Sequence, residues 1–438
     1  MRPLSTVFGG RRVVLAGAVA AAWTEHVGVL RDAGATDLLV VADGWGAGDP
    51  PDARVVVVEA PPGQSVMEHI RAEERFLADP PVEVRAALDE FDPDGDAVVL
   101  GSFLNVNPRL AGRAFLTHRH PEWVALEDKV VVDAFWDRAG ISRQPSAVVP
   151  LDRAEAAAEM LDRGDGTVWA ADARDGFHGG ASQTYWVADD DSRAAAIIGL
   201  RPVCDRVRVM PFLDGIPCSI HGIVMPDGVA VLRPVEMVTL RQDRRFVYAG
   251  CATYWDPPDG VREQMRSIAR TVGSQLAEEV GFRGTFTVDG VVTADGFWPT
   301  ELNPRFGAGI NAIARASGLP ILLINDLVAA GHDLDRSAVT IEAELVARAD
   351  TDRGGGTWMG GLTHDTDPGI RHVDGHTVTI GARFLRCVWR QESMPVGPAT
   401  AARACEFWNY ADRELGTRLG PLVPAPDLSP ERSPELRR

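Results

Sequence analysis

The chain has 438 residues, and its 62 acidic and 44 basic side chains give it a formal net charge of −18. This length predicts about three domains, and a hydrophobic content of 45% is typical of a soluble globular protein. The acidic balance argues against non-specific nucleic-acid binding, which needs a basic surface. The basic residues are all arginine apart from Lys129.

The single lysine excludes several cofactor-binding motifs. Lys129 lies in ALEDKVVVD, without a glycine loop before it or a Ser or Thr after it, so the chain has no P-loop. A protein-kinase strand lysine or a pyridoxal phosphate Schiff base would also have to use this residue. We attribute most of the arginine bias to a GC-rich coding sequence.

The cysteine and hydropathy patterns indicate a cytoplasmic protein. The five cysteines are odd in number and form no C-x-x-C pair, so we expect reduced thiols without a metal. No run of about 20 apolar residues is present, so we expect no membrane span. RRVVLAGAVAAAW is similar to a short secretion signal, but a helix and a second strand follow it. We therefore assign residues 13–15 to a first strand.

Residues 11–118 alternate short β-branched runs with helical stretches, which predicts a parallel sheet covered by helices. LAGAVAAA supplies Gly17 but not the three glycines of a dinucleotide-binding loop. From residue 123 the pattern changes to mixed strands and helices. We expect helices around 128–139, 153–161, 260–280, 321–330 and 401–414, and strands at 147–150, 207–212, 219–224 and 229–233, with two more strands around the glycine-containing loop between 167 and 187.

A hairpin around Asp295 is the most informative stretch. VDGVV and WPTELN read as strands joined through TADGF, and Asp-Gly is a strong turn signal. With Asp295 at the centre, Asp289 lies opposite Glu301 with Cβ atoms about 5 Å apart. The period of two adds Asn303 and Thr287 to that face. The side chains expected to point the other way, into a core, are Val288, Leu302, Val292 and Trp298.

Two carboxylates on one face favour a bound cation. Like charges opposite each other cost energy unless a cation bridges them. Asp289, Glu301 and Asn303 offer the hard oxygens that suit Mg²⁺. Arg305 lies two residues further on, where its guanidinium can bind a transferring phosphoryl group. The alternatives are two solvated acids and a surface ion pair of Arg305.

ELNPRFGAG at 301–309, preceded by the acid that ends GTFTVD, resembles the signature of ATP-grasp ligases. ALEDKVVVDAFWDRAGIS resembles the segment that carries the first ATP-binding lysine of that family, and Lys129 falls on its position. VRVMPFLDGIPCSIHGIV is similar to the adenine hinge, and DGFHGGAS to the loop that closes over the phosphates. The resemblance implies ATP and Mg²⁺ as cofactors. The ATP contacts that we infer from it are Lys129, Ala170, Gly179, Gly180, Ser182, Met210, Phe212, Leu213 and His221.

More closely, the chain resembles the pheganomycin-type peptide ligases. This implies an α/β and α+β multidomain protein: a Rossmann-like pre-ATP-grasp domain at 1–122, an ATP-grasp domain of two α+β lobes at 123–330, and a further domain at 331–420 that could bind the peptide. A disordered tail follows at 421–438. The resemblance implies joining of an amino-acid-like carboxylate, through an acylphosphate, to the N-terminal amine of a peptide in natural-product biosynthesis.

The chain departs from the ATP-grasp pattern at two points. The second ATP lysine is replaced by Ala170 or Ala171, and the hinge lacks its acid. Lys129 with Arg174, magnesium and loop amides could meet the phosphate charge instead. Arg241 is a candidate catalytic residue because it could bind phosphate or the substrate carboxylate, and a solvated loop is the alternative.

Several weaker features remain open. Ser219 and His221 share a strand face and could line the ATP pocket, although a core hydroxyl and histidine are at least as well supported. The pairs His118–His120 and His372–His376 each lack a third ligand, which argues against zinc. The alternative functions are a ligase with a small amine or hydroxy acceptor, as in D-alanine:D-alanine ligases, and a non-catalytic ATP-binding module. The sequence leaves a homodimer open.

Overall fold

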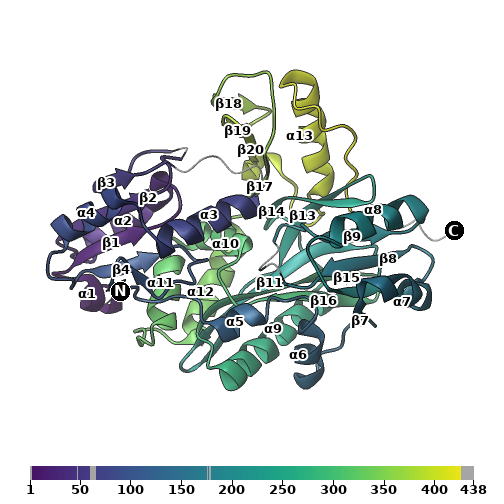
Figure 1. The fold of residues 1–438 in the computed structure, drawn as a ribbon, viewed down its shortest axis with the longest axis horizontal. Helices are drawn as coiled ribbons and strands as arrows, with labels where there is room; N and C mark the ends of the chain where they lie inside the picture. Colours follow the sequence, from purple (N-terminus) through teal and green to yellow (C-terminus); the bar gives the residue numbers. More distant parts are fainter. Residues whose placement is uncertain (1, 47, 60–65, 175, 177–178, 426–438) are drawn as a thin grey trace.

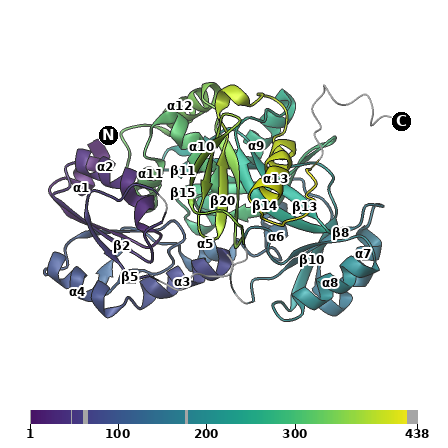
Figure 2. The ribbon, with the colours of Figure 1, turned by 90° about the horizontal axis from the view of Figure 1, so that it is seen from above.

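The computed structural model describes residues 2–46, 48–59, 66–174, 176 and 179–425. The strands form a four-stranded sheet, a 14-stranded sheet and a two-stranded ribbon. Figure 1 shows the four-stranded sheet at the left, the large sheet across the centre and right, and a smaller lobe at the top. Figure 2 shows the same parts from above, with the N-terminal sheet and the β7–β10 lobe at opposite ends.

The N-terminal sheet is parallel and has the order β3-β2-β1-β4. Its apolar strands are buried on both faces, because α1 and α2 pack on one side and α3 and α4 on the other. The chain leaves β1 in one direction toward β2 and later returns on its other side as β4. The elements are β1 (Arg12–Ala16), β2 (Asp37–Ala42), β3 (Arg54–Val57), β4 (Val98–Gly101), α1 (Arg2–Phe8), α2 (Thr24–Asp32), α3 (Val66–Ala78) and α4 (Val82–Phe91).

A short segment leads from this sheet into a small antiparallel lobe. The connecting elements are β5 (Arg109–Leu110), β6 (Arg113–Ala114), α5 (Pro121–Ala125) and α6 (Val132–Arg138). In the lobe, β10 pairs with both β7 and β8, and two helices bury their alanine-rich faces against these strands. The elements of the lobe are β7 (Ala147–Pro150), α7 (Ala154–Leu161), β8 (Thr167–Ala171), β9 (Thr184–Val187), α8 (Asp190–Leu200) and β10 (Arg206–Pro211).

The central sheet has one apolar face and one polar face. On β15, Phe286, Val288 and Val292 point into the core that is shared with α9. Thr287 and Asp289 alternate with them and point the other way, as the strand period of two requires. The elements are β11 (Ile216–Met225), β12 (Gly228–Val231), β13 (Val235–Gln242), β14 (Arg245–Ala252), α9 (Asp259–Val280), β15 (Gly284–Thr293) and β16 (Gly296–Asn303).

In the β15–β16 hairpin, the predicted pairing is confirmed at the end away from the turn and is wrong next to the turn. Asp289 pairs with Glu301, whereas Thr293 pairs with Gly296, so the turn is centred between residues 294 and 295. One extra residue, Thr300, bulges between the two registers and restores the predicted pairing. The prediction that Trp298 points into the core is therefore wrong. Phe297 occupies that place, and the indole of Trp298 donates a hydrogen bond to Thr293 Oγ1 at 3.1 Å.

The C-terminal part packs three helices near the central sheet and adds a lobe above it (Figure 1). Glu236 of β13 accepts hydrogen bonds from the backbone amides of Thr400 and Ala401 and so anchors the start of α13. The elements are α10 (Ala308–Ser317), α11 (Ile321–Ala329), α12 (Ala338–Thr351), β17 (Gly355–Gly360), β18 (Gly369–Val373), β19 (His376–Ile380), β20 (Phe384–Val388) and α13 (Ala401–Glu414); short 3₁₀ turns are η1 (Ala20–Trp23), η2 (Leu151–Arg153) and η3 (Gln391–Ser393).

Three further sequence expectations can be compared with these elements. The first strand is confirmed as β1, and α6 begins at Val132 rather than at residue 128. At the start of the predicted tail, Val423 pairs with Arg241 through backbone hydrogen bonds of 2.8 and 2.9 Å, and Leu422 is buried. Residues 426–438 lie outside the described residues.

Within the described ranges, no single helix is long and apolar enough to cross a membrane. The helices α10 and α11 pass this test as a pair, but they are bent by 115° relative to each other. Both bury their apolar faces in a core cluster through residues such as Ile310 and Ile324.

Candidate active site

The centre of the candidate site is the pair of carboxylates on the β15–β16 hairpin. Asp289 and Glu301 are cross-strand partners on the polar face of the central sheet. The bulge at Thr300 is tied to the opposite strand, because the Thr300 hydroxyl donates a hydrogen bond to the Asp289 carbonyl at 3.2 Å. The predicted juxtaposition of the two acids is therefore present.

Two hydrogen bonds fix the Asp289 carboxylate. Ser219 Oγ of the neighbouring strand β11 donates to Oδ1 at 2.5 Å, and Asn303 Nδ2 donates to Oδ2 at 2.9 Å. Burial and the nearby Glu301 carboxylate raise the pKa of Asp289 to about 7. Two donors thus orient the side chain, and Arg305 and Lys129 lower its pKa less than burial and Glu301 raise it, so a bound cation would stabilise its charged form.

Lys129 joins this site from a distant part of the sequence. Its Nζ lies 3.3 Å from Glu301 Oε2, and its side chain is 14% exposed. The turn before α6 brings it there, because Asp128 Oδ1 accepts a hydrogen bond from the Val130 amide at 3.0 Å. The single lysine of the chain therefore lies beside the predicted metal ligands.

Arg305 is held at the edge of the same group. Its Nη2 donates to Asn303 Oδ1 at 2.9 Å, and its Nε lies 3.3 Å from Glu127 Oε1. Arg119 also donates to Glu127 Oε1. The Glu127 side chain is 2% exposed, so the two guanidinium groups share one buried carboxylate. We call Asp289, Glu301, Asn303, Lys129 and Arg305 the grasp cluster.

Sequence reasoning missed Glu127 and Arg119. Glu127 lies two residues before Lys129, and Arg119 lies between the two histidines of HRH. The proximity to Lys129 was a usable signal for Glu127. No local pattern pointed to Arg119, because its contact with Arg305 through Glu127 depends on how three separate segments pack.

The predicted phosphate loop contacts the N-terminal part of the chain. The Gly179 amide lies 3.3 Å from Met67 Sδ on α3, and Ser182 Oγ donates to the Gly179 carbonyl at 2.7 Å. Gly180 has a φ of +63°, a conformation that glycine adopts readily. Asp175, Phe177 and His178 of the predicted loop lie outside the described residues.

The predicted adenine hinge follows β10. Met210 and Phe212 are buried, Leu213 is half-buried, and the Phe212 amide donates to the Gly166 carbonyl at 3.0 Å. The Phe212 ring stacks on Trp186 with centroids 4.1 Å apart. An aromatic wall that the sequence did not indicate therefore stands beside the hinge.

Arg241 belongs to this wall. Its Nη2 lies 2.8 Å from Asp214 Oδ1, and its guanidinium carbon lies 5.0 Å from the centroid of Phe212. Among the described residues, the side chain of Arg241 contacts Asp214, Trp186 and Phe212 rather than the grasp cluster. Its catalytic role stays a prediction.

The position of the missing lysine faces another cation. Ala170 on β8 pairs with Arg208 on β10, and Arg208 is 3% exposed. The Arg208 guanidinium binds both oxygens of Asp133 at 2.7 and 2.9 Å and donates to the Thr300 carbonyl at 3.2 Å. Arg174 contacts Asp205 at 2.9 Å instead. Arg208 is thus a cation close to Glu301 that the sequence did not single out.

His221 is enclosed by protein groups. Its Nδ1 lies 2.8 Å from Thr287 Oγ1, and a Cβ at Gly309 would lie 2.4 Å from its Nε2. Burial lowers the pKa of His221 to about 3, so the ring is neutral at physiological pH. These contacts favour the core histidine of the two alternatives, and its contact with ATP stays a prediction.

In the described ranges, no three or more His, Cys, Asp or Glu side chains are grouped so as to hold a metal ion by themselves. The grasp cluster offers two carboxylates and one amide oxygen. The donor set fits Mg²⁺, which commonly binds one or two protein carboxylates and completes its shell with phosphate oxygens and water.

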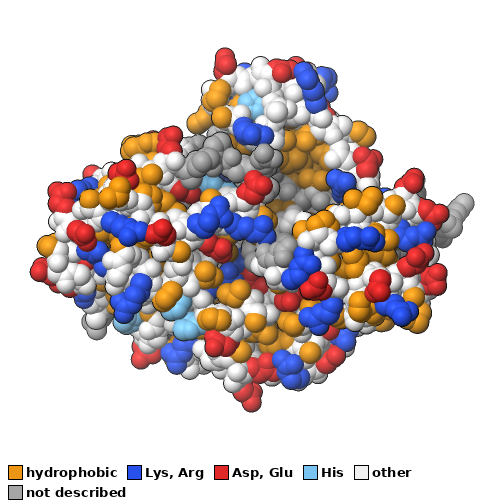
Figure 3. All heavy atoms as spheres, viewed as in Figure 1, with side chains coloured by type: hydrophobic (Ala, Val, Ile, Leu, Met, Phe, Trp, Pro, Cys, Tyr) orange, Lys and Arg blue, Asp and Glu red, His pale blue; other side chains and the backbone are white. Residues whose placement is uncertain are grey.

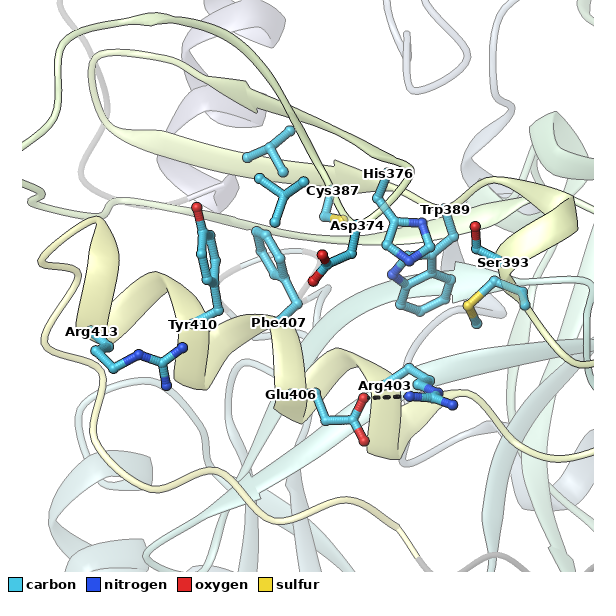
Figure 4. Close-up of a pocket in the computed structure, with 13 residues that line it drawn as sticks. Asp374, His376, Cys387, Trp389, Ser393, Arg403, Glu406, Phe407, Tyr410 and Arg413 are labelled. Atoms are coloured by element: carbon cyan, nitrogen blue, oxygen red, sulfur yellow. Dashed lines mark hydrogen bonds and ion pairs between the residues drawn. The ribbon is translucent and has the colours of Figure 1, made fainter.

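A cavity lies in the C-terminal lobe. It has a volume of about 370 Å³ and lies between the β18–β20 strands and α13. Figure 4 shows Phe407 and Tyr410 on α13 facing Asp374 and His376 of the hairpin, with Trp389 behind. Figure 3 shows the surface hollowed beneath this lobe, where hydrophobic side chains gather. The cavity combines aromatic walls with charged groups of both signs.

Residues 176–309 match the family model of the ATP-grasp domain, which includes Asp289, Glu301, Asn303 and Arg305. Residues 176–309 are therefore assigned to the ATP-grasp domain family. Over 149 residues it is 19% identical to the arginine-specific large chain of carbamoyl phosphate synthase from Geobacillus stearothermophilus. That alignment covers 34% of the chain and 14% of the relative, so the chain spans a small part of the relative's length.

The whole chain is similar in fold to several solved ATP-binding proteins. The biotin carboxylase domain of 2-oxoglutarate carboxylase from Hydrogenobacter thermophilus, solved with MgADP and bicarbonate, has a TM-score of 0.56 and 13% identity. The match covers 95% of this chain and 91% of that one. Biotin carboxylase from Campylobacter jejuni has a TM-score of 0.57 and 14% identity, covering 96% and 94%. N5-carboxyaminoimidazole ribonucleotide synthetase, solved with ADP, has a TM-score of 0.53 and 12% identity, covering 93% and 98%.

These comparisons bear out the predicted fold class. A parallel Rossmann-like sheet comes first in the chain, and the antiparallel strands of an ATP-grasp fold come after it. At identities of 12–14% the likeness concerns the fold, and substrates are a separate matter.

Proposed function

We propose that the protein is an ATP- and Mg²⁺-dependent ligase that activates a carboxylate as an acylphosphate and joins it to an amine. The observation that carries the proposal is the convergence of Asp289, Glu301, Asn303, Lys129 and Arg305 on one side of the central sheet. A protein that merely bound a nucleotide would not need Arg305 held in place by both Asn303 and Glu127.

The grasp cluster fits magnesium through its oxygen donors and through the raised pKa of Asp289. Asp289, Glu301 and Asn303 would hold the ion. When bound, Mg²⁺ neutralises charge on the phosphates of ATP. Ser219 keeps the Asp289 carboxylate in the orientation that ligation needs. Lys129 balances the negative charge of Glu301. It also adds positive charge at the place where, by the resemblance to the family, we expect the phosphates of ATP.

In the first step an oxygen of the substrate carboxylate attacks the γ-phosphorus of ATP. The bond from phosphorus to the β,γ-bridging oxygen breaks, ADP leaves, and an acylphosphate forms. Arg305 lies where its guanidinium can bind the oxygens of the transferring group, and Glu127 and Asn303 fix its plane. Arg208, whose charge is paired with Asp133, donates to the Thr300 carbonyl and so holds the bulge next to Glu301.

In the second step the amine attacks the acyl carbon. The carbon–oxygen bond to phosphate breaks, inorganic phosphate leaves, and the nitrogen loses a proton to give the amide. Arg305 stabilises negative charge on the tetrahedral intermediate and on the departing phosphate. No side-chain nucleophile is required.

For the substrates, we propose an amino-acid-like carboxylate, such as a nonproteinogenic one, and the N-terminal amine of a peptide. Support comes from the pheganomycin-type resemblance and from the C-terminal cavity, whose aromatic and charged walls suit a peptide segment (Figure 4). The three domains and their boundaries at residues 122, 330 and 420 belong to the same proposal, as do a role in antibiotic biosynthesis in the cytoplasm and a homodimer. A ligase with a small amine or hydroxy acceptor is the second candidate.

The test is ADP release from purified protein with a panel of carboxylates and amines, followed by mass spectrometry of the products. The proposal expects ADP release that needs both substrates and a product with the mass of their amide. ATP binding without turnover across the panel would instead support a non-catalytic binding module.

A further inference from the structure

A second group of carboxylates lies at the edge of the N-terminal sheet. Asp43 directly follows β2, and Glu73 lies on α3. The Asp43 residue is 4% exposed, and neither of its carboxylate oxygens has a hydrogen-bond partner. Glu73 Oε1 is also buried without a hydrogen-bond partner. Buried carboxylates are normally paired or hydrogen-bonded, so this arrangement needs an explanation.

Among the described residues, His69 is the basic side chain that lies beside the two acids. Its Nε2 is 3.9 Å from Asp43 Oδ2. The His69 side chain is 48% exposed. Burial raises the pKa of Asp43 and of Glu73, and the neighbouring Asp43 adds to the shift of Glu73. We call Asp43, His69 and Glu73 the sheet-edge cluster.

The backbone is shaped to admit Glu73. Gly17, which follows β1, has a φ of +90°, and a Cβ there would lie 2.6 Å from Glu73 Oε1. A side chain at residue 17 would displace the carboxylate from the sheet edge. Glycine is therefore required both by its conformation and by the close approach of Glu73.

The topology places this cluster where open α/β sheets bind ligands. The strand order β3-β2-β1-β4 reverses direction between β1 and β4. Ligands of such sheets bind outside the carboxyl ends of the strands at this switch point. Gly17 follows β1 and Ser102 follows β4, and hydrogen bonding by Ser102 and by the Ala18 backbone offsets part of the rise that burial causes in the pKa of Glu73.

Two observations connect the sheet edge with the region of the grasp cluster. Ser102 and Arg305 line one small cavity of about 40 Å³. The first turn of α3, the helix that carries His69 and Glu73, contacts the predicted phosphate loop through Met67 and Gly179. Figures 1 and 2 show α3 between the N-terminal sheet and the centre of the molecule.

We propose that the sheet-edge cluster binds the ammonium group of the amine substrate. A compact cation with several N–H donors can hydrogen-bond to both oxygens of Asp43 and to Glu73 Oε1, and it also balances their charge, which a neutral donor does not do. Transfer of one proton from the ammonium to Glu73 leaves the neutral amine that attacks the acyl carbon.

The inference rests on the proposed function, and the two can fail separately. Hydroxylamine, a small nucleophile that needs no ammonium site, traps acylphosphates, so ADP release with a carboxylate and hydroxylamine reports the first step. ADP release with the same carboxylate and an amine panel of glycinamide, L-alaninamide and triglycine reports the whole reaction. The variants are Asp43→Asn and Glu73→Gln, with Asp37→Asn, an exposed acid at the start of β2, as the matched control.

We expect each variant to raise the KM for the amine by about ten- to a hundredfold, the range for losing a charged hydrogen bond, while hydroxylamine-dependent ADP release changes less than twofold. Asp37→Asn should leave both unchanged. Calorimetric binding of the same amines, with their N-acetyl derivatives as neutral controls, should weaken in parallel. An unchanged KM and unchanged binding in folded Asp43→Asn and Glu73→Gln proteins would overturn the inference. If the wild-type protein releases no ADP with any carboxylate and hydroxylamine, the proposed function is overturned instead.

Discussion

The grasp cluster and the sheet-edge cluster are both pairs of carboxylates, but they differ in what surrounds them. Asp289 and Glu301 have donors and cations within reach: Ser219, Asn303, Lys129 and, beyond them, Arg305. Asp43 and Glu73 lie beside a half-exposed histidine, and hydrogen bonding from Ser102 and Ala18 reaches Glu73 but leaves both oxygens of Asp43 and Glu73 Oε1 without partners. The first arrangement positions its acids firmly for a metal and a phosphate. The second leaves its acids unsatisfied, as a site for a cationic substrate would.

Removing a carboxylate from the grasp cluster should have the largest effect. Glu301→Ala deletes a proposed Mg²⁺ ligand and the carboxylate that lies 3.3 Å from Lys129 Nζ. Because the charge stabilisation by a bound metal is worth several kcal/mol, we expect kcat to fall by at least about a thousandfold. The measurement is Mg²⁺-dependent phosphate release. Asp295→Ala, an exposed acid in the turn of the same hairpin, is the control, and unchanged activity of Glu301→Ala would remove the metal site.

Removing the transfer arginine should come next. Loss of one preorganised donor costs about 3 kcal/mol, so Arg305→Ala should lower kcat about a hundred- to a thousandfold with the fold intact. Arg305→Lys keeps the charge but loses the planar fork, and we expect a partial recovery. Arg262→Ala, on the exposed part of α9, should behave as wild type in steady-state kinetics. Near-normal turnover of Arg305→Ala would refute its assigned role.

Glu127 tests whether positioning matters as much as charge. Glu127→Gln keeps the shape of the side chain but removes the charge that Arg119 and Arg305 share. We expect kcat to fall about ten- to a hundredfold while the KM for ATP changes less than threefold. In an Arg305→Ala background the same substitution should have little further effect, because coupled residues are not additive. Full additivity in this double-mutant cycle would show that Glu127 acts elsewhere.

Asp326 is a third case for comparison with the two clusters: a buried acid that accepts one hydrogen bond from a neutral side chain. Asn325 Nδ2 donates to it at 3.1 Å, and burial raises its pKa to about 7. The folded state therefore holds a proton that the unfolded state releases near pH 4. The stabilisation is complete below pH 4 and is lost as the pH rises to about 7.

Asp326→Asn should remove this pH dependence. Relative to the wild type, its free energy of unfolding should gain up to about 4 kcal/mol between pH 4 and pH 7.5, since each pKa unit is worth about 1.4 kcal/mol. The measurement is urea unfolding of both proteins at the two pH values. A constant difference between them would contradict the raised pKa.

The sequence predicted most of the grasp cluster because Asp289, Glu301 and Asn303 lie on one hairpin. The pairing of Asp289 with Glu301 follows from the strand period, and it survived a misplaced turn because Thr300 bulges. Trp298 was misplaced for the same reason, since a bulge within a strand leaves no clear mark in the sequence. Lys129 was assigned through the resemblance to a family rather than through any local pattern.

Neither Arg119 nor the sheet-edge cluster could be predicted in this way. Glu73 becomes notable because α3 packs beside the end of β1, where Gly17 admits it. Asp43 becomes notable because its oxygens are buried without partners. Both facts depend on tertiary packing, which strand and helix periods do not specify.

The most direct test of the central claim uses a carboxylate substrate labelled with ¹⁸O in both oxygens, in a reaction with ATP, Mg²⁺ and an amine. If the grasp cluster transfers the γ-phosphoryl group to the carboxylate, each amide formed should be accompanied by ADP and by one inorganic phosphate that carries a single ¹⁸O. Unlabelled phosphate with amide formation, or release of AMP and pyrophosphate, would contradict the account.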